Sequence, residues 1–235
     1  MIEIVYSDRD LIVVNKPPGM PVHPGVSVSG ETLVGMLLER FPEIRGVGDN
    51  FSFRPGIVHR LDKDTSGVMV VARNQYAFDA LKQLFKSRQV EKIYRAIVCG
   101  RLRENQGIIS FPIGRSIKNP LKRAAVQGKS AVRGEREAIT EYRLIKEWEG
   151  LSLVELCPKT GRTHQLRVHM KAIGHPVACD RVYGGKNVCC PEGADRQMLH
   201  AQSISFSFDG GRRFRFEADP PEDFSRAVRV IDSAP

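Results

Sequence analysis

The pattern of hydrophobic and polar residues is most informative between Ile57 and Ala72. A polar stretch, His59–Asp62, is followed by turn-forming Asp, Thr, Ser and Gly within residues 63–67, and then by the apolar, β-branched run Val68–Ala72. Such a run is typical of a strand buried on both faces. A polar loop that leads directly into a buried strand has a fixed position, and folds often carry reactive groups on such loops. Asp62 is therefore the first candidate for chemistry.

Short strands separated by turns dominate the rest of the pattern. Alternation within Glu91–Val98 predicts that Tyr94 and Ala96 share one face of a strand. Gly210 and Gly211 predict the turn of a last hairpin. The strands predicted besides Val68–Ala72 are 11–15, 91–98, 107–113, 138–145, 151–156, 204–208 and 213–216.

Three helices are predicted between these strands, and the tail from Pro220 is expected to lie on the surface. The first contains Leu33, Met36 and Leu37 and ends before Pro42, and the second is capped by Asn74 and carries Phe78, Leu81 and Phe85. The third is expected to start with Thr163 as its N-cap, to carry Leu166, Met170 and Ile173, and to end at Gly174. This order of elements predicts an α+β fold with a mostly antiparallel mixed sheet and flanking helices and loops.

An arginine on the third helix is a candidate partner for Asp62. Arg167 lies about 100° around the helix from Leu166, at the edge of the packed face, and can reach a partly buried carboxylate. An arginine fork keeps an aspartate ionised, as a nucleophile must be. From the residues alone, a loop carboxylate that caps Thr65 or the Gly67 amide is the favoured explanation of Asp62, and Asp64 is equally eligible for a chemical role.

The charge balance points to a polyanionic partner. The 235 residues carry a net charge of +9, and the pI is about 9.5. Such a balance favours nucleic acid first and an acidic membrane surface second. The segment from Arg115 to Arg136 is strongly basic and lacks an amphipathic apolar face, so a loop or hairpin that follows a phosphate backbone is expected there. Its other basic residues are Lys118, Lys122, Arg123, Lys129 and Arg133, opposed by Glu135.

Other classes of chemistry find no support in the sequence. The N-terminus lacks the pattern of a secretory signal, and no apolar run approaches the roughly 20 residues that span a bilayer, so a cytoplasmic protein is expected. The five cysteines form no paired C-x-x-C, which predicts reduced thiols without a structural role and no zinc site. No phosphate-binding loop, dinucleotide fingerprint, G-x-S-x-G elbow or zincin spacing occurs.

Several motifs identify a family resemblance. His59–Gly67, read HRLDKDTSG, resembles the H-R-L-D-x-x-T-S-G signature of RluA-type RNA pseudouridine synthases. Further matches follow in the family's order and cover nearly the whole chain. They are Val14–Gly19 with Val22–Pro24, Lys92–Tyr94, Thr160–Met170, Gly174–Val177 through Asp180, Tyr183–Gly184, and Leu199–Ala201.

The resemblance implies an enzyme that isomerises uridine to pseudouridine in ribosomal or transfer RNA, with no cofactor and no metal. It implies that Asp62 is the catalytic aspartate, attacking either the uracil ring or the anomeric carbon. Tyr94 would stack near the base and take part in proton transfer, and Arg167 would pair with Asp62. Arg60 would occupy the place left by the flipped nucleotide. The expected substrate-binding residues also include His59, Arg162, His164 and Gln165.

The resemblance also sets expectations about organisation. Residues 1–235 are expected to form one catalytic domain without the S4-type RNA-binding domain of many relatives, so residues 115–136 would contribute RNA affinity. A monomer is expected, bound to RNA and not to a membrane or an obligatory protein partner. Cys179 stands where relatives usually have glycine. Two other classes stay open: a catalytically silent RNA-binding protein, and an aspartate-nucleophile hydrolase of nucleosides or small phosphates.

Overall fold

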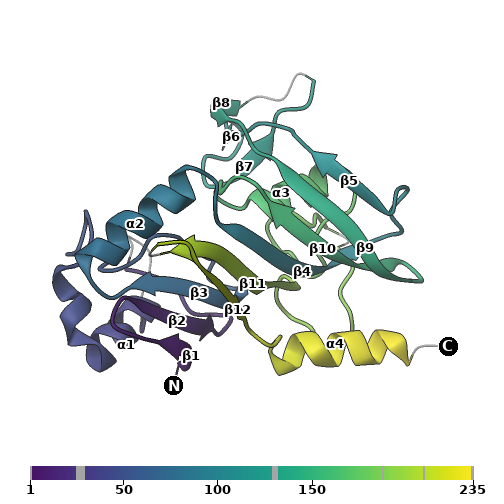
Figure 1. Cartoon of the computed structure of the whole chain (residues 1–235). Helices are drawn as coiled ribbons and strands as arrows, with labels where there is room; N and C mark the ends of the chain where they lie inside the picture. The colour runs from purple at the N-terminus through teal and green to yellow at the C-terminus, as the bar shows by residue number, and fades with distance from the viewer. Residues whose placement is uncertain (1, 25–29, 129–131, 187, 209, 234–235) are drawn as a thin grey trace. The chain divides into compact units, whose positions relative to one another are not determined.

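The protein is described by a computed structural model that covers residues 2–24, 30–128, 132–186, 188–208 and 210–233 (Figure 1). The chain divides into two compact units. The first, called the N-unit here, consists of Met1–Lys92 and Ala201–Pro220, and the second, the C-unit, of Ile93–His200 and Pro221–Pro235. The fold is α+β and its sheets are largely antiparallel, as the sequence predicts.

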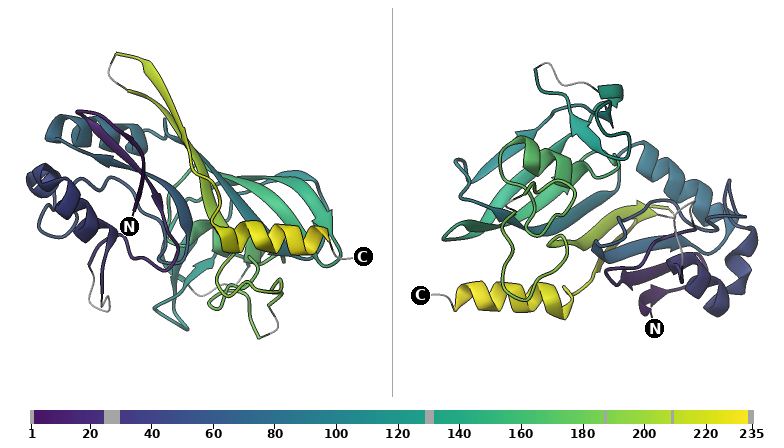
Figure 2. Two further views of the ribbon diagram at one scale, coloured as in Figure 1. Left: turned by 90° about the horizontal axis from the view of Figure 1, so that it is seen from below. Right: turned by 180° about the vertical axis from the view of Figure 1, so that it is seen from behind.

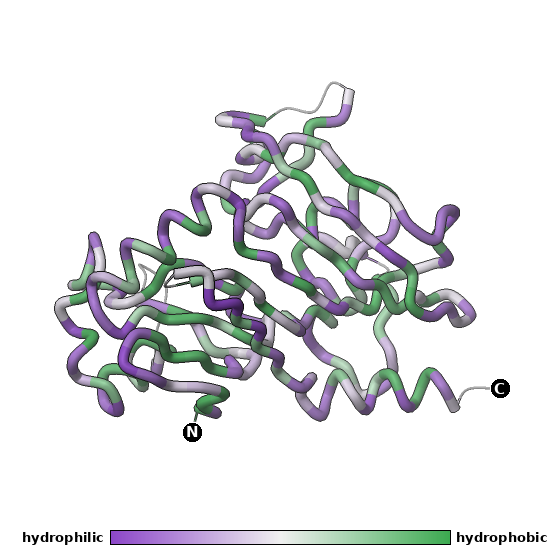
Figure 3. Tube along the Cα trace, in the orientation of Figure 1, coloured by the Kyte–Doolittle hydropathy of each residue, from purple (hydrophilic) through white to green (hydrophobic). Residues whose placement is uncertain are grey.

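The N-unit is built on a sheet whose centre is the predicted buried strand. The strand order is β1-β2-β3-β11, and β12 pairs with β11 in a hairpin that is clear in Figure 2. All seven residues of β3 are buried, and β2 and β3 are mostly hydrophobic in Figure 3. The strands are β1 (Glu3–Ser7), β2 (Leu11–Lys16), β3 (Ser66–Ala72), β11 (Leu199–Phe208) and β12 (Arg212–Glu217).

Two predicted helices of the N-unit begin where their capping residues place them. Thr32 Oγ1 accepts the Gly35 N–H at 3.1 Å at the start of α1 (Leu33–Arg40). Asn74 Oδ1 accepts the Ala77 N–H at 2.9 Å at the start of α2 (Gln75–Lys86), which packs against β3. These bonds satisfy amides that have no partner within the helix. A short 3-10 helix, η1 (Pro42–Gly46), follows α1.

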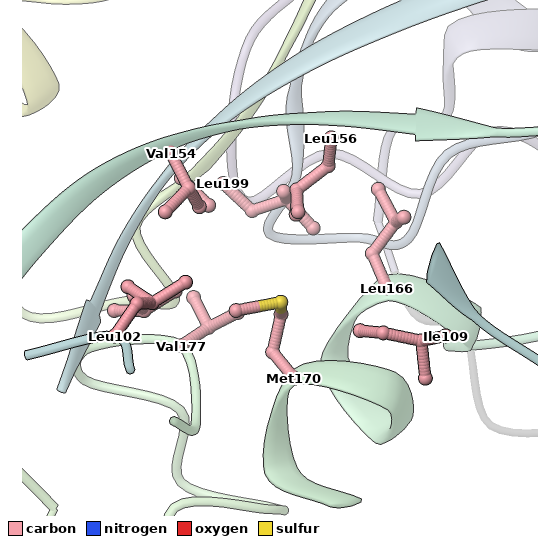
Figure 4. Close-up of a cluster of buried hydrophobic side chains, with 10 residues drawn as sticks. Leu102, Ile109, Val154, Leu156, Leu166, Met170, Val177 and Leu199 are labelled. Atoms are coloured by element: carbon pink, nitrogen blue, oxygen red, sulfur yellow. The ribbon is translucent and has the colours of Figure 1, made fainter. Parts of the chain in front are cut away.

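The C-unit holds a sheet with strand order β4-β10-β9-β5, and all three neighbouring pairs are antiparallel. Figure 4 shows Leu166 and Met170 of helix α3 (Gln165–Ala172) pointing into the buried cluster that also contains Val154 and Leu156 of β10. Helix α3 therefore covers one face of this sheet. The strands are β4 (Glu91–Cys99), β5 (Gln106–Ile109), β9 (Thr140–Trp148) and β10 (Leu151–Pro158).

The basic segment forms a separate three-stranded sheet with order β7-β6-β8, where a loop or hairpin was predicted. Its strands are β6 (Ile113–Ser116), β7 (Arg123–Ala125) and β8 (Val132–Arg136). The predicted strand 107–113 is instead divided between β5 and β6, because Pro112 has no N–H to donate to a ladder. Lys129 lies outside the described residues.

Two helix predictions need correction. Helix α3 has His164, not Thr163, as its N-cap, and His164 adopts the left-handed conformation with φ +57°. The predicted end of α3 is right, since Gly174 follows it with φ +90°. The tail lies at the surface as expected, but it forms an unpredicted fourth helix, α4 (Glu222–Asp232), with Phe224, Ala227 and Ile231 buried. These positions recur at i, i+3 and i+7, the spacing of a packed helix face.

The prediction of reduced cysteines without a structural role is wrong for this structure. Cys99 pairs with Cys189, and Cys179 pairs with Cys190, with Cα–Cα distances of 5.6 and 4.7 Å. Cys157 takes part in neither bridge. The partners of the first bridge are 90 residues apart, so the tertiary fold and not a local motif brings them together. No helix of the described chain has the length and apolar composition needed to cross a membrane.

The close approach of β3 and β11 at Gly67 can be tested by substitution of this glycine. A Cβ at this residue would lie 2.2 Å from the carbonyl oxygen of Ala201, and Gly67 has φ +120°. We expect Gly67→Ala to lower the free energy of unfolding by about 3 kcal/mol or more, measured by urea denaturation. Gly150→Ala is the matched control, because Gly150 has φ +71° but open space around it, and should cost about 1 kcal/mol. Equal losses would contradict the close approach.

The disulfides are tested by unfolding with and without reductant. Each bridge restricts the unfolded chain, so reduction is expected to lower the free energy of unfolding by about 2–4 kcal/mol per bridge. Cys157→Ser should respond to reductant as the wild type does, whereas a Cys179→Ser, Cys190→Ser double variant should keep only the response of the other bridge. A stability that does not depend on reductant would argue against both bridges.

Candidate active site

The loop that carries Asp62 is tied to the strand that follows it. The Asp62 carbonyl accepts the Thr65 N–H at 3.1 Å, which closes a turn immediately before β3. Thr65 is buried, whereas Asp62 is half-buried. The local sequence thus fixes the backbone of Asp62 while part of its surface stays open to solvent, as a reactive carboxylate requires.

A buried lysine holds the same loop from the other side. Lys16, at the end of β2, is 0% exposed, and its Nζ donates to the carbonyl oxygens of Pro17, Met20 and Lys63 at 2.8, 2.9 and 2.9 Å. Three bonds match the three N–H donors of an ammonium group. Lys63 is the direct neighbour of Asp62. This role of Lys16 was not predicted from the sequence, where its position at the end of an apolar strand was the available signal.

His59 has a packing role within the N-unit. Its Nε2 accepts the Val70 N–H at 3.0 Å, and its ring stacks on Phe85 with centroids 4.7 Å apart. Burial lowers the pKa of His59 to about 3, and the positive charge of Lys92 acts in the same direction. The imidazole is therefore neutral at physiological pH and anchors the loop to β3.

Arg60, in contrast, is exposed. Its Nη1 lies 3.4 Å from Nε2 of His23, whose Nδ1 contacts the Pro24 carbonyl at 2.9 Å. Nδ1 of His23 is therefore the donor and Nε2 the acceptor in this arrangement. The guanidinium of Arg60 is available to a large polyanionic ligand at the surface of the N-unit.

In the C-unit, Arg167 forms a buried ion pair with Asp180. Arg167 Nε and Nη2 donate to Asp180 Oδ2 and Oδ1 at 2.7 and 2.8 Å, and the two side chains are 6% and 0% exposed. Asp180 Oδ1 also accepts the N–H groups of Val182 and Tyr183 at 2.9 and 3.0 Å. Burial would raise the pKa of Asp180, but the hydrogen bonds and charge of Arg167 and these amides hold it below its usual value. A bidentate pair of this kind fixes the guanidinium plane.

Tyr94 lies in β4 opposite Leu156 of β10. It is half-buried and packs against the cluster that contains Ala96, which confirms the predicted alternation. Because α3 covers this face, Tyr94 and the helix that carries Arg167 lie on the same side of the C-unit sheet. Asp62 belongs to the N-unit, and its pairing with Arg167 stays a prediction.

The other predicted binding residues of the C-unit have internal partners. Gln165 is 4% exposed. Its side-chain oxygen accepts from Thr160 Oγ1 and the Arg162 N–H at 2.8 and 3.0 Å. Its side-chain nitrogen donates to the Ile139 carbonyl and Thr140 Oγ1, each at 3.0 Å. Gln165 thus ties the turn before α3 to the sheet.

Arg162 and His164 flank this turn. Arg162 Nε donates to the Glu137 carbonyl at 2.9 Å, and His164 Nδ1 lies 2.7 Å from the Tyr183 hydroxyl. Asp180 as the partner of Arg167, and Tyr183 as the partner of His164, were not predicted from the sequence. Both lie within segments of the motif set, but their pairing depends on the tertiary fold. Within the described ranges, no group of three or more His, Cys, Asp or Glu side chains is arranged to hold a metal ion.

Comparison with known proteins identifies the class. Residues 10–172 match the family model described as RNA pseudouridylate synthase. An uncharacterized RNA pseudouridine synthase of Bacillus subtilis is 39% identical over 98% of this chain and 73% of its own length. Ribosomal large subunit pseudouridine synthase D of Zymomonas mobilis is 40% identical, with the same coverage of both chains. The solved structure of human RNA Pseudouridylate Synthase Domain Containing 1 aligns with a TM-score of 0.75 and 29% identity, covering 100% of this chain and 96% of that one.

The α+β fold, the anchored aspartate loop and these matches define an RNA-modifying isomerase. The chain belongs to the RNA pseudouridylate synthase family, and it is an RNA pseudouridine synthase of the RluA type. The family expected from the motifs is confirmed.

The neutral state of His59 has a measurable consequence for stability. Because its folded pKa lies below the ordinary value of 6.5, the unfolded chain binds a proton that the folded chain does not. The free energy of unfolding should therefore fall as pH decreases from about 6.5 towards 3, by up to about 1.4 kcal/mol per pH unit from this residue. His59→Gln keeps an acceptor but cannot titrate, and should lose this component. Urea denaturation of both proteins at several pH values tests this prediction; identical pH slopes would contradict a neutral, half-buried His59.

Proposed function

We propose that this chain converts specific uridines to pseudouridine in folded ribosomal RNA, with Asp62 as the nucleophile. The observation that carries the proposal is the anchoring of the Asp62 loop between the buried Lys16 ammonium and the fully buried strand β3. The ribosomal substrate is suggested by the relatives named ribosomal large subunit pseudouridine synthase D. Transfer RNA is the alternative substrate.

In the proposed reaction, the Asp62 carboxylate attacks either the uracil ring or the anomeric carbon of the ribose. In both cases the glycosidic bond between N1 and the anomeric carbon breaks. The base turns, and carbon 5 bonds to the anomeric carbon; where Asp62 had bonded to that carbon it is displaced in this step, and where it had added to the ring it is eliminated afterwards, so the free carboxylate is regenerated. The proton on carbon 5 then leaves, and N1 gains a proton, so no external reactant is consumed. We assign Tyr94 to the face of the base and to proton transfer at carbon 5. Arg167, fixed by Asp180, would keep Asp62 ionised.

The target uridine must leave the RNA stack before this chemistry. Flipping a nucleotide costs a few kcal/mol. We assign Arg60 to the vacated position, because its guanidinium is exposed and can stack on bases and contact phosphates. Its proximity to His23 gives it a defined starting position. The other predicted binding residues would then act chiefly by holding the loops that bind RNA, because each forms hydrogen bonds within the protein. They are His59, Arg162, His164 and Gln165.

The three-stranded sheet β6–β8 is the proposed surface for the flanking RNA. Arg115, Arg133 and Arg136 on its strands are exposed, as is Lys118 in the loop after β6. Close to them, Leu121 is 91% and Ile117 47% exposed. Arginine and lysine side chains bind phosphates, and binding of this kind weakens as salt increases.

We further propose that residues 1–235 act as one catalytic domain, as a monomer without an obligatory protein partner, in the cytoplasm. The support for this location is the substrate, since folded RNA is intracellular. Disulfides are rare in reducing compartments such as the cytoplasm, whereas this structure contains two. The activity of the enzyme is therefore to be measured both with and without reductant.

The test is tritium release from RNA labelled at carbon 5 of uridine, prepared from cells that lack the enzyme. Asp62→Asn should lower the release rate by at least about 1,000-fold, since it removes the nucleophile. Asp64→Asn is the matched control: it changes a half-buried aspartate two residues away and should keep most of the activity.

Each result has a clear meaning. Loss of release only in Asp62→Asn supports the proposal, and sequencing of the product then identifies the RNA and the uridine. Release by both variants would remove Asp62 from its role, and loss in Asp64→Asn alone would transfer the role to Asp64. Binding of RNA by the wild type without any release would indicate a silent RNA-binding protein.

A further inference from the structure

Tyr183 lies at the junction of several C-unit elements that the proposed reaction uses. Its side chain is almost fully buried, with 3% of the residue exposed. The guanidinium carbon of Arg167 lies over its ring, 5.0 Å from the centroid. Its backbone N–H donates to Asp180 at 3.0 Å. The same residue thus contacts both members of the buried ion pair.

The hydroxyl of Tyr183 connects this ion pair to the basic sheet. It accepts the backbone N–H of Arg123, the first residue of β7, at 3.0 Å. It also forms a hydrogen bond of 2.7 Å with His164 Nδ1. A buried phenol requires such partners.

A second bond joins the same two regions. Lys122, directly before β7, donates from Nζ to the Val182 carbonyl at 2.8 Å. Ile113 of β6 and Val168 of α3 pack with Tyr183 in one buried cluster, which Ala125 of β7 also contacts. The sheet β6–β8 is therefore attached to the turn that holds Asp180, and not only to its neighbours in sequence.

We propose that Tyr183 is a positioning residue that couples RNA bound on the β6–β8 sheet to the orientation of Arg167. The coupling runs from the Arg123 N–H to the phenol hydroxyl, and through the ring to the guanidinium on its face. Flanking RNA that holds β7 in place holds the ring, and the ring holds Arg167 in its catalytic orientation. The inference rests on the proposed function, since it assigns the sheet to RNA and Arg167 to the reaction.

The test compares two RNA lengths. One substrate is the stem-loop that contains the modified uridine, and the other is the same stem-loop with its flanking helix. The Arg133→Ala variant identifies which RNA contacts the β6–β8 sheet. For an RNA that contacts the sheet, this substitution should raise KM and leave kcat unchanged. For the wild type, kcat with the extended RNA is expected to exceed kcat with the stem-loop.

Tyr183→Phe removes only the hydroxyl and keeps the ring over Arg167. We expect it to lower kcat with the extended RNA by about 5- to 10-fold, the effect of one buried hydrogen bond, and to leave its KM within 2-fold. With the stem-loop, kcat should fall by less than 2-fold. A purely structural role would lower kcat equally for both RNAs. Tyr6→Phe is the matched control, because the Tyr6 hydroxyl donates to Asp8 at 2.7 Å within the N-unit.

Lys122→Met provides a second variant if Tyr183→Phe is unstable, since it removes the bond to Val182 and should also abolish the gain in kcat from extended RNA. Equal kcat losses for both RNAs, no loss at all, or no RNA that responds to Arg133→Ala would each overturn the inference. The proposed function would survive these results as long as the wild type releases tritium. If the wild type releases none, both fail.

Discussion

The buried pair of Arg167 and Asp180 is the interaction on which the C-unit depends most. Burying two charges is costly, and removal of one partner leaves the other uncompensated. Here the geometry is bidentate, and two backbone amides share the carboxylate, so each polar group has several partners. The result is a guanidinium held in the plane of the Asp180 carboxylate. The turn after Asp180 is thereby fixed to α3, and the basic sheet is attached to that turn.

The N-unit also contains a buried cation that fixes part of the proposed site, in this case a lysine. Lys16 is buried, and its ammonium group donates hydrogen bonds to carbonyl oxygens around the Asp62 loop. His59 adds a neutral ring that fixes the loop to β3. In both units, a buried charged group holds the backbone or the side chain that we assign to chemistry. Such preorganisation lowers the cost of orienting reacting groups, which is a major part of catalysis.

Local patterns in the sequence predicted much of this fold, and tertiary partners could not be predicted. The buried strand β3, the helix cap Asn74 and the alternation in β4 follow from short-range rules. The disulfides, the partner of Arg167 and the role of Lys16 depend on contacts between distant segments. The left-handed His164 displaced the predicted N-cap by one residue. Cys179 illustrates the same limit: it has φ +58°, a backbone conformation that glycine adopts more readily than other residues.

We propose that an anchored aspartate attacks a uridine turned out of the RNA stack, with Arg167 paired to Asp180. The most direct measurement is a crystal structure of the Asp62→Asn variant bound to a uridine-containing stem-loop. We expect the uridine to lie out of the stack with its base between residue 62 and Tyr94, Arg60 to occupy the vacated position, and the bonds between Arg167 and Asp180 to be intact. A uridine that stays stacked in the RNA, with residue 62 and Arg167 both remote from it, would contradict the account.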